Sequence, residues 1–177
     1  MKVVVPLSST SQSQTSETGS FDLTPEQSFF ASSKKKYVGY ISGVGAGKTF
    51  AGIARTLLNM ERWNPGEMGA IVAPTRTMVL DVIISEMREL NIFDWQGYEF
   101  HSTHTEEPGI HGPNGSRALI LSADNRTTVE RLKGLNLAWW WMDEEAEIDP
   151  RAREILMQRL RTGEYRNGFI TTTPKGY

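Results

Sequence analysis

The stretch from Ser42 to Thr49, Ser-Gly-Val-Gly-Ala-Gly-Lys-Thr, constrains the fold more than any other part of the 177 residues. It follows an apolar run, Tyr37 to Ile41, that is typical of a strand, and it leads into a helical pattern from Phe50 to Met60. Glycines at such a junction let backbone N–H groups curl around phosphates, and the helix N-terminus adds the positive end of its dipole. The stretch therefore predicts a nucleotide phosphate site, although Ser42 stands where the usual motif begins with glycine.

Each residue of this loop has a predicted role. The Lys48 ammonium is expected to reach the β- and γ-phosphates of a nucleotide, and the Thr49 hydroxyl is expected to bind Mg²⁺. A Gly-rich loop without any ligand is the alternative interpretation. The predicted nucleotide contacts within the loop are Ser42, Gly43, Val44, Gly45, Ala46, Gly47, Lys48 and Thr49.

Acidic residues end another apolar run, Leu137 to Met142, which is typical of a buried strand. Asp143 is predicted to hold Mg²⁺ opposite Thr49, and Glu144 is predicted to orient and deprotonate the attacking water. Glu145 could replace Glu144 as the base if a bulge at the end of the strand shifted the register by one residue. Alternatively, these acids form only a solvated cap on the following helix.

A third polar motif, Thr171-Thr172-Thr173, ends the last apolar run, Gly168 to Ile170. Threonine is a common strand former, so the motif can reflect β-propensity alone. Its place after the acid-bearing strand instead favours a sensor of the γ-phosphate, in which the hydroxyls of Thr171, Thr172 and Thr173 respond to hydrolysis.

Apolar runs alternate with helical patterns along the chain, which predicts a three-layer α/β fold with a largely parallel sheet. Further elements are expected over Gly69 to Ala73 (a buried strand), Arg76 to Leu90 (a helix) and Pro150 to about Arg161 (a helix). In such sheets ligands bind at the carboxyl ends of the strands. All three polar motifs fall at these ends.

Two other runs, Tyr98 to His101 and Arg117 to Ser122, are predicted to pair as an inserted β-ribbon around a turn at Pro113-Asn114-Gly115. Three histidines and two glutamates lie on the ribbon or its loop. Their spacing matches no helix face, so a surface role is preferred to a metal site formed by His101, His104, His111, Glu106 and Glu107.

Residues 1–20 are predicted to form a flexible Ser/Thr/Gln-rich tail. Residues 8–20 contain six Ser, three Thr and two Gln, which offer too little apolar surface to offset the entropy lost on ordering. Order is expected to begin at residue 21, with Thr24 as a helix N-cap, Pro25 in the first turn and Gln27 as the capping-box partner. Residues 21–177 then form one domain.

Composition excludes several classes of protein. The chain has no cysteine, which excludes disulfides and thiolate metal sites. No apolar run is long enough to span a membrane, and Val3-Val4-Val5 is too short for the core of a signal peptide. The formal charge of −2 gives no global basic field for nucleic acid, so a DNA contact must be local or come from other subunits. Trp139-Trp140-Trp141 is expected to pack in the core rather than stack on bases.

Together these motifs resemble the ATPase domain of the large terminase, the DNA-packaging motor of tailed bacteriophages. The resemblance rests on the order and spacing of the loop Ser42 to Thr49, the strand Trp139 to Glu145 and the stretch Ile170 to Gly176. Leu23 to Gln27 also resembles the family's adenine-contacting Gln motif, and parts of residues 114–134 resemble its stretch upstream of the acidic motif.

The resemblance implies an ATPase that uses Mg²⁺, assembles as a ring on the viral portal and drives double-stranded DNA into a procapsid. The host cytoplasm would be its location, and the small terminase subunit a further partner. Gln27 would recognise adenine, and Arg131, or as second choice Arg126, would act as an arginine finger on a neighbour's γ-phosphate. Thr172 and Thr173 would couple hydrolysis to movement. A helicase-type ATPase and a nucleotide-binding module without turnover are the alternatives.

The chain departs from the family in three respects. Val44 stands where many relatives carry an arginine, and Ser42 replaces the first glycine of the loop. The family's full-length enzyme continues into an RNase H-like nuclease, for which this chain has no room. We therefore expect residues 21–177 to be the motor domain alone, truncated at its C-terminal end, whether as a fragment, an engineered piece or a split gene product.

Overall fold

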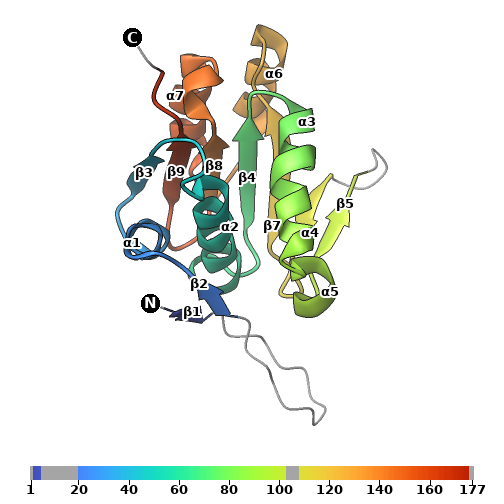
Figure 1. Ribbon diagram of the computed structural model, residues 1–177. Coiled ribbons are helices and arrows are strands. Elements are labelled where there is room, and N and C mark those ends of the chain that lie inside the picture. The colour runs from blue at the N-terminus through green and yellow to red at the C-terminus, as the bar shows by residue number, and fades with distance from the viewer. Residues whose placement is uncertain (1, 5–19, 103–107, 176–177) are drawn as a thin grey trace.

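A computed structural model of the protein describes residues 2–4, 20–102 and 108–175. Its strands are β1 (Lys2–Val4), β2 (Ser20–Asp22), β3 (Tyr37–Ile41), β4 (Met68–Ala73), β5 (Glu99–His101), β6 (Gly109–His111), β7 (Arg117–Ser122), β8 (Trp139–Asp143) and β9 (Asn167–Thr172). A seven-stranded sheet has the order β3-β9-β8-β4-β7-β6-β5 (Figure 1). The strands from β3 to β7 in this order pair in parallel, and β6 and β5 are added antiparallel at one edge.

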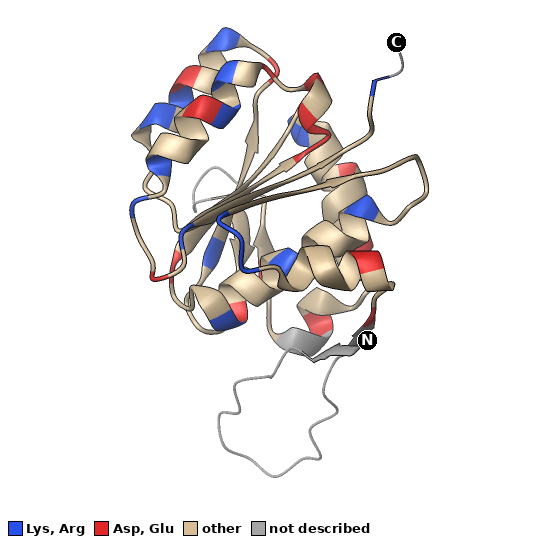
Figure 2. Ribbon diagram, turned by 90° about the vertical axis from the view of Figure 1, so that its left-hand side faces the viewer, with Lys and Arg blue, Asp and Glu red and all other residues tan. Residues whose placement is uncertain are grey.

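Helices cover both faces of this sheet, as the edge-on view in Figure 2 shows. The helical segments are α1 (Pro25–Ser32), α2 (Lys48–Leu58), η1 (Asn59–Trp63), α3 (Arg76–Met78), η2 (Val79–Ile84), α4 (Ser85–Glu89), α5 (Ile92–Gln96), α6 (Arg126–Arg131), η3 (Leu132–Gly134), η4 (Glu145–Glu147) and α7 (Pro150–Arg159). The segments from α1 to α5 pack on one face, and α6, η3 and α7 pack on the other. The predicted three-layer α/β fold is confirmed.

The central strand β8 is buried along its whole length. Its tryptophans account for the glycines at two positions on the adjacent strands. Trp139 and Trp141 face α2, whereas Trp140 faces α7. A Cβ added to Gly69 of β4 would lie 1.9 Å from the Trp139 ring, and one added to Gly168 of β9 would lie 2.2 Å from the Trp140 ring. The tryptophans therefore pack in the core, as predicted, and only glycine on the adjacent strands admits them.

The inserted ribbon differs from its prediction. The turn at residues 113–115 joins β6 to β7, and β5 pairs with β6 rather than with β7. β6 was missed because its three residues are too few for an alternating pattern and begin with Gly109. That glycine lies so close to β7 that an added Cβ would be 2.3 Å from the Ala118 carbonyl oxygen, so it serves close packing rather than a turn.

The N-terminal part of the fold begins as predicted. Thr24 caps α1, with Pro25 in the first turn, and Gln27 completes a capping box. Before α1, β1 pairs with β2 as a separate antiparallel ribbon, while residues 5–19 lie outside the described residues. Residues 2–4 and Ser20, predicted to belong to the flexible tail, thus form strands instead, and for residues 5–19 the tail stays a prediction. Among the described helices, none combines the length and the apolar character that crossing a bilayer requires.

Candidate functional site

The connection between β3 and α2 is a Gly-rich loop at the carboxyl end of the sheet, at the top of Figure 1. Gly45 and Gly47 have φ angles of 78° and 67°, which residues with a Cβ rarely adopt. Gly47 is the N-cap of α2 and supplies no side-chain cap. The first N–H groups of α2, which begins two residues earlier than predicted, therefore have the arrangement that binds phosphate at helix starts.

Gln27 ties α1 to this loop. Its Oε1 accepts a hydrogen bond from the Thr24 N–H at 2.9 Å, and its Nε2 donates to the carbonyl oxygens of Ala46 and Gly47, each at 3.3 Å. A Cβ on Gly47 would lie 2.3 Å from this Nε2. The capping role is confirmed, and an adenine contact by the same amide stays a prediction.

Lys48 lies between the loop and the acidic strand end. Only 8% of the residue is exposed. Its Nζ donates to the carbonyl oxygens of Gly43 at 3.1 Å and Ser42 at 3.5 Å, and it lies 3.9 Å from Glu144 Oε1. The two unusual loop positions differ in environment. Ser42 Oγ is buried without a hydrogen-bond partner among the described residues, whereas the Val44 side chain projects into solvent.

Asp143 ends β8 opposite Thr171 of β9. It is 6% exposed, and its Oδ1 accepts a hydrogen bond from Thr171 Oγ1 at 2.6 Å. Burial, the largest effect, raises the pKa of Asp143 to about 6, against the lowering effects of the Thr171 hydrogen bond and the Lys48 charge. The carboxylate is thus held rigidly where its own charge is poorly solvated.

Glu144 follows directly and turns the chain out of the strand. Its φ of 49° places it in the left-handed region, which costs a non-glycine residue about 1–3 kcal/mol and is frequent at functional sites. Its carboxylate accepts hydrogen bonds from the Thr173 N–H at 3.1 Å and from the Thr173 hydroxyl at 3.4 Å. The strained backbone thereby points the carboxylate toward β9 and Lys48.

Glu145 does not occupy an equivalent position. The pairing of β8 with β9 runs in regular register from Trp139 to Asp143, so this described stretch lacks the bulge that would move Glu145 into the place of Glu144. Its Oε1 instead accepts a hydrogen bond from Arg153 Nη1 at 3.0 Å. Of the two acids, Glu144 is therefore the one that lies beside Lys48 and Thr173; its role as the base stays a prediction.

All three threonines of the motif bond to the acidic segment. Thr171 donates to Asp143 and Thr173 to Glu144. Thr172 Oγ1 accepts a hydrogen bond from the Ala146 N–H at 3.1 Å. The sequence placed both motifs at the carboxyl ends of strands, and the structure brings them into contact. The sensor role itself stays a prediction.

A pocket of about 360 Å³ lies between the loop and the strand ends. Its lining includes two residues that the sequence did not indicate as site residues, Phe50 and Glu86 of α4. The pKa of Glu86 is raised by burial and by the charges of Glu89 and Asp143. Glu86 belongs to no motif, and on a helix it looks like any solvated acid. The lining residues are Val44, Gly45, Gly47, Lys48, Thr49, Phe50, Glu86, Glu144 and Thr173.

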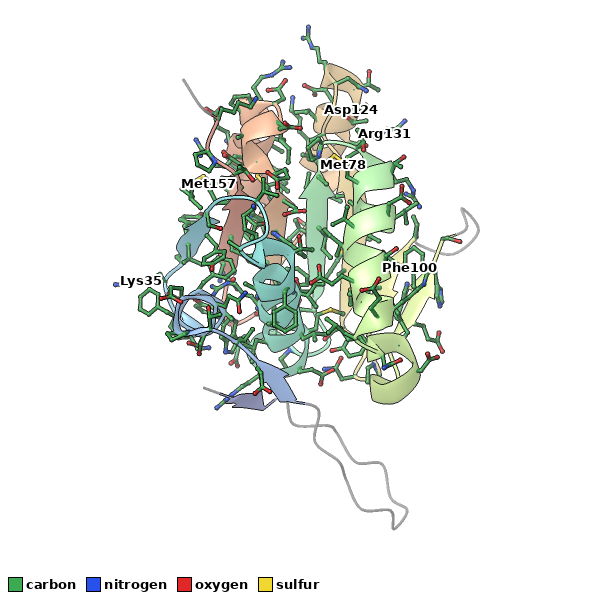
Figure 3. All side chains as sticks on the ribbon, in the orientation of Figure 1. Lys35, Met78, Phe100, Asp124, Arg131 and Met157 are labelled. Carbon is green, nitrogen blue, oxygen red and sulfur yellow. The ribbon has the colours of Figure 1, made fainter. Side chains whose placement is uncertain are left out.

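Arg131 and Arg126 are exposed on α6 and do not line this pocket. Figure 3 shows Arg131 at the upper end of the molecule, on the side of Asp124 and Met78. Neither arginine therefore contributes to the pocket of its own chain. A finger that acts on a neighbouring subunit is compatible with this position and stays a prediction.

The histidine cluster gives no metal site in the part of the chain that the structure describes, where no group of three or more His, Asp or Glu is arranged to hold an ion. The rings of His101 and His111 stack with their centroids 4.3 Å apart. His104, Glu106 and Glu107 lie outside the described residues.

A mostly parallel sheet with helices on both faces and a Gly-rich loop before α2 defines a P-loop NTPase-like domain. Residues 40–177 match the family described as the N-terminal part of the T4likevirus-type large terminase subunit. The chain therefore belongs to the large terminase family, as the resemblance predicted. The match begins after α1, so Gln27 lies outside it.

Solved structures agree on the fold. The large terminase of a thermophilic bacteriophage superimposes with a TM-score of 0.71 at 14% identity, over 86% of this chain and 39% of that one. The ATPase domain of the Thermus phage P74-26 large terminase gives a TM-score of 0.60 at 20% identity, over 89% of this chain and 67% of that one. The chain thus spans about two fifths of the first of these relatives. No curated protein matches it.

Proposed function

We propose that this chain binds and hydrolyses ATP as part of the motor that packages double-stranded DNA into a phage procapsid. One observation carries the proposal: Lys48 at the start of α2, Glu144 after β8 and Thr173 after β9 meet at one pocket beside the Gly-rich loop. A cation for the phosphates and an oriented carboxylate for the attacking water are what phosphoanhydride hydrolysis needs. Family membership supports the same function, and one related large terminase has been solved with ADP and with ATP-γ-S.

The backbone from Gly43 to Gly47, together with Lys48, would hold the phosphates. A Cβ added to Gly43 or Gly45 would meet no atom within 4 Å, so the loop leaves open space on this side. Phosphates placed there lie at the N-terminus of an 11-residue helix, where backbone N–H groups and the helix dipole favour negative charge.

The oxygen atoms beside the loop fit Mg²⁺. The Thr49 hydroxyl and the Asp143 carboxylate are the hard ligands that this ion prefers. The raised pKa of Asp143 indicates that the protein alone compensates its buried charge poorly, as expected for a carboxylate that binds a cation. Thr49 and Asp143 would hold the ion, which when bound neutralises charge on the β- and γ-phosphates.

Glu144 would accept the proton of the attacking water. Thr173 holds its carboxylate through two hydrogen bonds, and Lys48 lies beside one of its oxygens. These contacts fix the orientation of the base, which general-base catalysis requires. Because the same threonine motif also contacts Asp143, we propose that Thr171, Thr172 and Thr173 sense the γ-phosphate and couple its loss to movement.

The wider assembly is proposed from the family. It comprises a ring of subunits on the portal protein, the small terminase subunit and double-stranded DNA, in the host cytoplasm. Gln27 would contact adenine, and Arg131, or in its place Arg126, would reach the γ-phosphate of a neighbouring subunit.

Separate measurements of ATP binding and phosphate release test the proposal. Wild type is expected to bind ATP with Mg²⁺ and to release phosphate, and Lys48→Ala is expected to lose binding. Glu144→Gln should bind ATP and hydrolyse it at least about 100-fold more slowly. Lys35→Ala and Glu147→Gln remove exposed charges outside the pocket and should match wild type.

Each other outcome has a definite meaning. Absence of ATP binding by wild type would refute the proposal. Binding without phosphate release, even at high protein concentration, would identify a nucleotide-binding module without turnover. Unwinding of duplex DNA coupled to hydrolysis would favour a helicase-type ATPase.

A further inference from the structure

Trp141 donates its indole N–H from the core into the acidic end of the sheet. Its Nε1 lies 2.6 Å from Thr171 Oγ1, and the same oxygen lies 2.6 Å from Asp143 Oδ1. Trp141 and Thr171 are completely buried. The three side chains thus form one continuous series of hydrogen bonds from the core to the carboxylate at the end of β8.

The hydrogen bonds of this series can be donated in only one direction, from Trp141 to Thr171 and from Thr171 to Asp143. An indole N–H is a donor only, so Thr171 Oγ1 must accept from it, and the single hydroxyl hydrogen of Thr171 is then directed to Asp143. Without the indole N–H the hydroxyl could rotate, and Asp143 would lose a fixed donor. Trp141 therefore determines how Thr171 holds the carboxylate.

The indole ring is itself held against the helix that follows the Gly-rich loop. A Cβ on Gly52, three residues after Thr49, would lie 2.2 Å from Cζ2 of Trp141, so the ring lies directly on the α2 backbone. Phe169 of β9 stacks on the same ring, with centroids 5.8 Å apart and an interplanar angle of 15°. Trp141 thus links the position of α2 to the orientation of Asp143.

We propose that Trp141 is a positioning residue for the nucleotide-bound metal. It acts through Thr171 to fix the orientation of the Asp143 carboxylate relative to α2. The inference rests on the proposed function, in which Asp143 and Thr49 bind Mg²⁺. Hydrogen bonds that orient metal ligands are typically worth about 10- to 100-fold in metal affinity or activity. Sequence patterns had assigned Trp141 only to the core.

Trp139 provides a matched control on the same strand and the same face of the sheet. It is completely buried, and Phe169 stacks on it with centroids 6.3 Å apart. Its Nε1, however, has no hydrogen-bond partner among the described residues. Replacement by phenylalanine therefore removes an indole at either position and a hydrogen bond to the site only at Trp141.

The test measures the affinity for ATP-γ-S by calorimetry, in excess Mg²⁺ and in EDTA. Trp141→Phe is expected to weaken binding in Mg²⁺ by about 10-fold and to leave binding in EDTA unchanged. Trp139→Phe should change neither. Thr171→Val should show the same loss as Trp141→Phe, Thr171→Ser should keep wild-type affinity, and the double variant Trp141→Phe/Thr171→Val should lose no more than either single variant.

Two results would overturn the inference. One is an equal loss in Trp141→Phe and Trp139→Phe, and the other is a loss in EDTA as large as that in Mg²⁺; either assigns Trp141 to packing alone. The proposed function would still stand if wild-type binding is abolished by Lys48→Ala. If wild type binds no ATP-γ-S, the proposed function fails, and the inference fails with it.

Discussion

Asp143, the proposed metal ligand, is expected to lower the stability of the fold at neutral pH. Burial raises the pKa of its carboxyl from 3.8 to about 6. The folded protein therefore binds this proton more tightly than the unfolded chain does. The stability contributed by Asp143 is fully present below pH 3.8 and is lost as the pH rises through about 6. A shift of this size corresponds to about 3 kcal/mol.

Asp143→Asn is therefore expected to raise the free energy of unfolding at pH 7 by about 2 kcal/mol. It should also remove the decrease in the free energy of unfolding that the wild type shows as the pH rises from about 4 to 6. The same variant should lose ATP turnover that depends on Mg²⁺. Urea denaturation at several pH values measures the first effect. Asp149→Asn is the control, because Arg151 lowers the pKa of Asp149 to about 2. This substitution should lower the free energy of unfolding at pH 7 rather than raise it. Equal stability of Asp143→Asn and wild type at pH 7 would contradict the prediction.

Residues found from the sequence share one property: each stands in a local motif. Lys48, Asp143 and Glu144 follow strand patterns at fixed offsets. Glu86 and the indole of Trp141 reach the site from elements whose patterns indicate only a helix and a buried strand. Their roles depend on which segments become neighbours in space, and local patterns do not encode this.

Among the elements, α1 and α2 are joined by a buried cation that also supports the site. Arg55 of α2 is completely buried, and its Nη1 donates to the carbonyl oxygens of Phe30, Ala31 and Ser33 at the end of α1. Burial lowers the pKa of Arg55 to about 10, so it stays charged at neutral pH. Because α1 carries Gln27, this contact also holds the Gly-rich loop.

Arg55→Met is expected to lower the free energy of unfolding by about 3–5 kcal/mol, because the buried carbonyl groups of Phe30 and Ala31 and the half-buried one of Ser33 would lose this donor. Arg55→Lys should fall between this variant and wild type, since an ammonium keeps the charge but not the planar fork. Arg62→Met, at an exposed position of η1, is the control and should change stability by less than about 0.5 kcal/mol. Guanidinium denaturation checks the series, and equal losses at both positions would refute the assignment.

Strands and helices with a long apolar pattern were predicted correctly. The pairing of the strands in the inserted ribbon was predicted wrongly. The buried runs of β4, β8 and β9, and the half-exposed apolar run of the edge strand β3, are long enough for a strand pattern to be visible in the sequence. β6 has three residues, and its pairing with both β5 and β7 depends on the close approach at Gly109. Short strands held by tertiary contacts leave no periodic signal in the sequence.

At the scale of the whole molecule, the pocket is formed without an arginine of its own chain. Arg131 is exposed at the upper end of the molecule (Figure 3), and it lies outside the lining of the pocket. If it acts as a finger, catalysis requires a second subunit. The rate of phosphate release per chain should then rise with protein concentration, and Arg131→Ala should abolish that rise.

Mixing two inactive variants tests this arrangement directly. Arg131→Ala keeps an intact Glu144, and Glu144→Gln keeps an intact Arg131. In a ring with one repeated interface, an equal mixture should therefore restore about a quarter of the wild-type interfaces. Phosphate release from the mixture, compared with each variant alone, gives the result. Restoration with Arg126→Ala in place of Arg131→Ala would assign the finger to Arg126, and no restoration with either would exclude both arginines from catalysis between subunits.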